Sequence, residues 1–80
     1  MKRILHVITQ NDRMNGGIIL EQAKEAHVEL IFLHEPTVLE GIDCYRLVDK
    51  NNLLEDKGFL SVTYAGMIEK IFGADTVITW

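Results

Sequence analysis

The sequence has 80 residues, which is enough for one small domain but too few for a second hydrophobic core. Its net charge is −4, with acidic and basic residues mixed along the chain, which argues against the clustered lysine and arginine of a nucleic-acid-binding surface. No apolar run approaches the roughly 20 residues of a membrane span, and the apolar start is too short for a signal peptide. We therefore expect one cytoplasmic domain over 1–80 that contacts no membrane and binds no nucleic acid directly.

The first half of the chain alternates between buried strands and polar segments. Residues 3–9 form an apolar, β-branched run, typical of a strand buried on both faces of a parallel sheet. A polar loop over 10–17 leads into a short helix from about 17 to 26. A second buried strand over 28–33 stops at His34-Glu35-Pro36, because proline lacks the N–H group that a sheet needs. One helical turn at most is expected over 37–41.

The second half repeats this alternation. A third strand covers 42–48, and a short helix over 49–57 is expected to begin at Asp49 as its N-cap and to end at Gly58. A fourth strand covers 59–62. Thr63 then caps a helix over 64–72, in which apolar residues recur at helical spacing: Tyr64, Met67, Ile68, Ile71 and Phe72.

The last segment is the most distinctive part of the sequence. It reads as a fifth strand that begins near Asp75 and closes on Trp80, the only tryptophan. Chain ends usually fray, so a large aromatic residue here predicts that the strand is tied into a sheet, a subunit contact or a site. Strands that alternate with helices throughout imply right-handed crossovers. We therefore predict an α/β fold, a three-layer α/β/α sandwich with a mostly parallel five-stranded sheet.

The residues that might carry chemistry form no recognisable catalytic pattern. Cys44 is the only cysteine and lies near the start of its strand, so a packing role is favoured over a persulfide or nucleophilic one. His34, Glu35 and Asp49 follow strands at the carboxyl edge of the sheet, where ligand sites of parallel α/β folds gather. His6 lies in the middle of its strand among apolar residues, which favours a hydrogen-bonded core or interface histidine over a catalytic one. The spacing of histidines matches no metal motif, and one cysteine cannot complete a zinc site, so no metal and no cofactor are expected.

Three segments of the chain nevertheless form a recognisable pattern when they are taken together. The first is Ile4-Leu5-His6-Val7 in the first strand, and the second runs from Leu47-Val48-Asp49 to Leu53-Leu54-Glu55-Asp56-Lys57-Gly58. The third is Val62-Thr63-Tyr64-Ala65-Gly66-Met67-Ile68, followed by Val77-Ile78-Thr79-Trp80. In their order and spacing they resemble the DsrE/DsrF/DsrH-like sulfur-relay proteins, and most closely the TusB/DsrH branch. The segment around His34-Glu35-Pro36-Thr37 departs from the family's usual, longer crossover.

The resemblance implies a subunit of a complex with TusC/DsrF-like and TusD/DsrE-like partners. That complex passes persulfide sulfur toward 2-thiouridine at the tRNA wobble position, or within sulfur oxidation. The family's carrier cysteine lies where the third strand meets its helix, which here falls near Asp49, Lys50 and Asn51 and holds no cysteine. The resemblance thus implies a non-catalytic subunit without activity alone, in which Cys44 does not inherit the carrier role. Tyr64 and Trp80 are expected at an interface or as an anchor of the last strand.

Two alternatives follow from the same residues. Cys44 itself is the candidate carrier if the protein accepts a persulfide. Alternatively, the protein self-associates as a homo-oligomeric module that binds a small ligand at the His34 and Glu35 end of the sheet.

Overall fold

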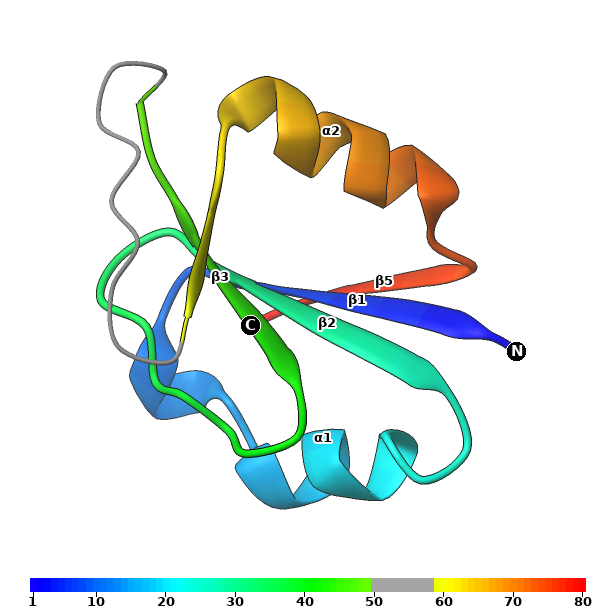
Figure 1. Cartoon of the computed structure of the whole chain (residues 1–80). Helices are drawn as coiled ribbons and strands as arrows, with labels where there is room; N and C mark the ends of the chain where they lie inside the picture. Colours follow the sequence, from blue (N-terminus) through cyan, green and yellow to red (C-terminus); the bar gives the residue numbers. More distant parts are fainter. Residues whose placement is uncertain (50–58) are drawn as a thin grey trace.

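Five strands form one sheet in the computed structural model, which describes residues 1–49 and 59–80 (Figure 1). The strand order is β4-β3-β2-β1-β5, and each neighbouring pair is parallel. The strands are β1 (Arg3–Ile8), β2 (His27–Phe32), β3 (Asp43–Leu47), β4 (Leu60–Val62) and β5 (Thr76–Thr79). The predicted α/β class and all five strands are confirmed, and the described sheet is wholly parallel.

Among residues 1–49 and 59–80, one α-helix covers each face of the sheet. These are α1 (Gly16–Gln22) and α2 (Tyr64–Gly73), and a short 3-10 turn, η1 (Asn11–Arg13), precedes α1. The connection from β1 to β2 and the connection from β4 to β5 run in opposite directions across the sheet. Because crossovers between parallel strands are right-handed, opposite directions place the two helices on opposite faces. Figure 1 shows this arrangement, with α1 below the sheet and α2 above it.

The apolar residues divide into two cores, one on each face. Ile19 of α1 is fully buried against the first core, and Met67 of α2 is buried against the second. On the α1 face the buried residues are Ile8, Ile19, Ala26, Val28, Leu30, Phe32, Ile42 and Cys44. On the α2 face they are Leu5, Ile31, Val62 and Met67. The near-continuous apolar strands of the sequence are thus explained by burial on both faces.

Each helix begins at a side-chain cap. The Oδ1 atom of Asn15 accepts a hydrogen bond from the Ile18 N–H at 3.1 Å, and the Oγ1 atom of Thr63 accepts one from the Gly66 N–H at 3.2 Å. Helix α1 ends at Gln22, four residues earlier than expected, because the chain must turn before β2 begins at His27 in register with β1. Residues 23–26 form that turn.

The connection from β2 to β3 contains no helix. Residues 33–42 are irregular apart from a turn at Glu40 and Gly41, in which Gly41 takes a φ of 83° that favours glycine. Leu39 packs against the α1-face core, and its N–H lies 3.5 Å from the sulfur of Cys44. The short crossover therefore covers part of the α1 face of the sheet.

The predicted apolar stripe of the last helix is split by the structure. Met67 is buried and Ile71 is half-buried against the sheet, whereas Tyr64, Ile68 and Phe72 are 65%, 38% and 85% exposed. These three residues are spaced four apart, so they lie along one side of α2. Only part of the stripe is a packing face, and the rest forms an exposed apolar row.

The expected helix over 49–57 and its closing Gly58 fall almost wholly outside the described residues. Asp49, which is described, is exposed and belongs to no helix or strand.

The cap of α2 leads to a first prediction. Thr63→Ala removes the acceptor for the Gly66 N–H and should lower the free energy of unfolding by about 1 kcal/mol. Thr63→Ser keeps the hydroxyl and should retain most of the stability. Urea unfolding followed by circular dichroism measures both, and equal loss in the two variants would show that the hydroxyl is not the stabilising group.

Candidate functional site

The strand-end residues predicted from the sequence do not converge. His34 and Glu35 are exposed in a bend after β2, and Glu35 lies 3.7 Å from Arg46 of β3 through Oε1 and Nη2. Glu35 is 84% exposed, so this ion pair is weak. No hydrogen bond or ion pair within residues 1–49 and 59–80 joins His34 to Asp49. The structure places these residues at the predicted edge without assembling them into a site.

Asp49 instead borders a separate pocket at the carboxyl ends of β3 and β4. The pocket has a volume of about 290 Å³, and the other described residues that line it are Val48, Thr63, Tyr64 and Ala65. The side chain of Tyr64, an expected contact residue, is therefore exposed beside this pocket at the first turn of α2. The described lining residues offer one carboxylate, from Asp49, and two hydroxyls, from Thr63 and Tyr64, but no histidine.

Cys44 is packed in the α1-face core. Only 2% of the residue is exposed, and its sulfur lies 3.5 Å from the Leu39 N–H and 3.5 Å from the Ile42 carbonyl oxygen. Burial raises the pKa of the thiol, an effect that the Leu39 N–H partly offsets and the charge of Asp43 reinforces. A buried thiol with a raised pKa is a poor nucleophile. Cys44 therefore has the surroundings of a packing residue.

Trp80 is tied to the central strand through both its backbone and its side chain. Its N–H donates to the Val7 carbonyl at 2.9 Å, and its own carbonyl accepts from the Thr9 N–H at 2.9 Å. The indole Nε1–H donates to Nδ1 of His6 at 2.8 Å. The half-buried ring also packs against the α1-face core. Trp80, which directly follows β5, is thus anchored to β1.

These contacts determine the protonation state of His6. Indole nitrogen only donates, so Nδ1 of His6 must carry a lone pair, and Nε2 must carry the proton that it shares with Gln22 Oε1 at 2.6 Å. His6 is fully buried. Burial lowers its pKa, and the hydrogen bond to Gln22 offsets this only in part. His6 is therefore a neutral, fully bonded core histidine that links β1, α1 and Trp80.

A polar cluster that the sequence did not predict lies at the opposite, amino edge of the sheet. Lys70 of α2 donates to Glu29 of β2 at 2.7 Å, and its Nζ lies 4.3 Å from the centre of the Tyr45 ring. Burial alone would raise the pKa of Glu29 and lower that of Lys70. Their mutual attraction outweighs the effect of burial, so the pKa of Glu29 is lowered and the pKa of Lys70 is raised. Both groups are therefore held in their charged forms.

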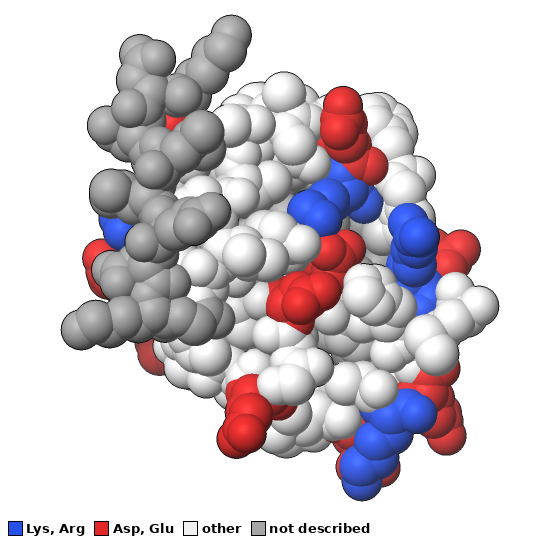
Figure 2. Space-filling view, in the orientation of Figure 1, with Lys and Arg blue, Asp and Glu red and all other residues white. Residues whose placement is uncertain are grey.

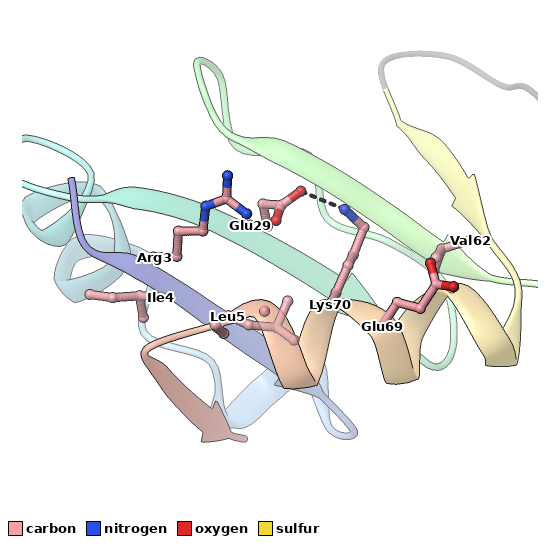
Figure 3. Close-up of a pocket in the computed structure, with 10 residues that line it drawn as sticks. Arg3, Ile4, Leu5, Glu29, Val62, Glu69 and Lys70 are labelled. Atoms are coloured by element: carbon pink, nitrogen blue, oxygen red, sulfur yellow. Dashed lines mark hydrogen bonds and ion pairs between the residues drawn. The ribbon is translucent and has the colours of Figure 1, made fainter.

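This ion pair borders a pocket of about 270 Å³ between α2 and the start of β1 (Figure 3). Figure 3 shows Lys70 reaching from α2 to Glu29, with Arg3 of β1 beside them. Leu5 and Val62 form part of the apolar floor. Charged groups of both signs above an apolar floor suit a small polar molecule. The position is unusual, because ligand sites in parallel α/β folds usually lie at the carboxyl edge of the sheet.

The same edge also gathers metal-ligating side chains. One ligand atom each from His27, Glu29 and Asp43 lies within 4.8 Å of the others. The expectation of no metal site rested on the spacing of residues along the sequence. That spacing does not show that Asp43 of β3 lies opposite Glu29 of the neighbouring strand β2. The only local signal was the His27-x-Glu29 spacing, which places two ligands on one face of a strand.

Charges of both signs are interspersed on the face seen in Figure 2. Acidic and basic side chains are scattered over it, and no continuous basic patch is visible there. Within the described part of the chain, no helix is long and apolar enough to cross a membrane.

The sequence matches no family model, and no curated protein or solved structure matches it either.

The buried His6 predicts an acid-sensitive fold. Its pKa is lowered by burial, so below the usual value of about 6.5 the unfolded chain binds more protons than the folded one. Stability should be fully present above pH 6.5 and fall on acidification, at a slope approaching about 1.4 kcal/mol per pH unit. Urea unfolding between pH 5 and about 7.5 measures this slope.

Matched variants identify the group responsible. His6→Gln should flatten the slope in this range, whereas His34→Gln, which changes an exposed histidine, should keep it. A slope that is the same in His6→Gln and in the parent would mean that another group titrates.

Proposed function

We propose that this protein is a non-catalytic, cytoplasmic subunit of a persulfide-transfer complex of the TusB/DsrH type. The observation that carries the proposal is the burial of Cys44, the only cysteine of the chain. Sulfur transfer needs an accessible thiolate, and Cys44 is enclosed with a raised pKa. A chain with this fold and without an exposed thiol fits an accessory role better than a carrier role.

The resemblance supports the same reading at the edge of the sheet. In the family, the carrier cysteine stands where the third strand meets its helix. Asp49 follows β3 at that place and is exposed, and no cysteine lies beside it in the sequence. In this proposal the partner, a TusD/DsrE-like subunit, supplies the thiol, and the sulfur goes to the wobble uridine of tRNA or into sulfur oxidation.

The exposed row on α2 supports a permanent partner. Tyr64, Ile68 and Phe72 place three large apolar side chains on one side of the helix, and Phe72 is 85% exposed. Aromatic residues are enriched in the cores of protein interfaces. A small domain also gains stability from a partner, because it buries only about 60% of the surface that its unfolded chain exposes. We assign this row, including the expected contact residue Tyr64, to the interface with a TusC/DsrF-like or TusD/DsrE-like subunit.

The buried thiol gives a direct test of the non-catalytic role. When the native protein is incubated with a cysteine desulfurase and a sulfur donor, its intact mass should not rise by one sulfur atom. The same thiol should react with an alkylating reagent much faster in denaturant than in buffer, because unfolding exposes Cys44. A sulfur adduct that forms on the native parent but not on Cys44→Ser would favour the carrier alternative.

The interface gives a second test. Phe72→Glu should abolish co-purification with TusC- and TusD-like proteins from native extract without lowering the melting temperature, because the side chain is largely exposed. Leu20→Glu is the matched control, since Leu20 is 45% exposed on α1 and should leave the complex intact. Recovery of the parent protein alone would count against an accessory subunit, and a homo-oligomer would favour the self-associating module.

A further inference from the structure

Three potential metal ligands meet on the α2 face at the amino edge of the sheet. His27 and Glu29 are two residues apart on β2, so their side chains point to the same face. Asp43 is the residue of β3 directly opposite Glu29 in the parallel register. The ligand atoms of all three lie within 4.8 Å of one another.

We propose that His27, Glu29 and Asp43 bind a divalent transition-metal ion of the zinc class. Zinc bonds to nitrogen and oxygen are about 2.0–2.2 Å long, so the ligand atoms of a tetrahedral site stand about 3.4 Å apart. His27 Nε2 and Glu29 Oε1 are already 4.0 Å apart. Binding an ion would draw the three ligand atoms, which lie within 4.8 Å of one another, closer together.

The ligand types favour this class of ion. Imidazole suits zinc, copper, iron and nickel, whereas magnesium and calcium sites are built from oxygen ligands. One imidazole and two carboxylates carry a formal charge of −2, which a divalent cation neutralises. Three protein ligands also leave a fourth position of a tetrahedral ion open to water or to another ligand.

The surroundings allow an ion to enter and hold the central ligand in place. The side chain of His27 is 48% exposed and Asp43 is exposed, so two ligands face solvent. Glu29 is only 18% exposed, and Lys70 fixes its Oε2 atom at 2.7 Å. The Oε1 atom faces His27 and is the oxygen that the site uses.

Lys70 also opposes the ion, because its ammonium group is a like charge bonded to one of the ligands. The parent protein should therefore bind zinc more weakly than a variant without this charge. This site lies across the sheet from the strand-end positions where the carrier of the sulfur-relay family would stand, so its test is separate from that of the proposed function.

Calorimetric titration of the full chain with zinc tests the site. We expect saturable binding of one ion per chain. His27→Gln and Asp43→Asn should each weaken it by at least about tenfold, since mutations even of outer-shell partners typically cost 10–100-fold. His34→Gln is the matched control, because it removes an exposed histidine after β2 and should leave the affinity unchanged. Circular dichroism checks that each variant is folded.

The Lys70→Met variant should change the zinc affinity in the opposite direction. It frees Glu29 from its ion pair, so zinc should bind more tightly than to the parent and raise the melting temperature by a larger amount. Absence of saturable zinc binding by the parent would overturn the proposal. So would binding that survives both His27→Gln and Asp43→Asn, because the ion would then occupy other ligands.

Discussion

The structure depends on satisfying one buried imidazole. His6 lies in β1, the strand between β2 and β5, and is fully enclosed, so both ring nitrogens need partners inside the protein. Gln22 of α1 supplies the acceptor and Trp80 supplies the donor. These partners are 16 and 74 residues away along the chain. One polar group therefore connects the first strand, the helix on one face and the segment beyond the last strand, and loss of either partner would leave a buried nitrogen unpaired.

The two ends of the parallel sheet differ in chemistry. At the carboxyl edge, His34, Glu35 and Asp49 are all exposed, and the described lining of the pocket beside Asp49 holds no second charged group. At the amino edge, Glu29 and Lys70 form a partly buried pair between the sheet and α2. In the proposed accessory role, a partner that brings its own reactive group needs a surface rather than a finished site. The exposed row on α2 begins at Tyr64 beside the carboxyl edge and ends at Phe72 toward the amino edge. The amino edge is the place where this chain's own charged groups meet.

Local sequence predicted the elements better than the contacts between them. The strands were recognisable because burial on both faces leaves few polar positions, and Thr63 marked the start of α2 through its capping hydroxyl. The helical spacing of α2 showed which residues share a side but not how much of that side the sheet would cover, so the exposure of Phe72 was missed. The pairing of Glu29 with Asp43 and Lys70 depends on strand register and helix placement. Such long-range geometry leaves no periodic signal along the chain.

The position of β5 has a consequence for folding during synthesis. β1 pairs with β2 on one side and with β5 on the other, and the second pairing joins residues more than 70 positions apart, as in the hydrogen bond between the Asp75 N–H and the Arg3 carbonyl. Until residues 75–80 leave the ribosome, β1 keeps one unpaired edge of backbone N–H and C=O groups and His6 lacks its indole donor. An open strand edge can pair with other chains. That edge of β1 therefore stays open to aberrant strand pairing until residues 75–80 have been made, and pairing with β5 closes it.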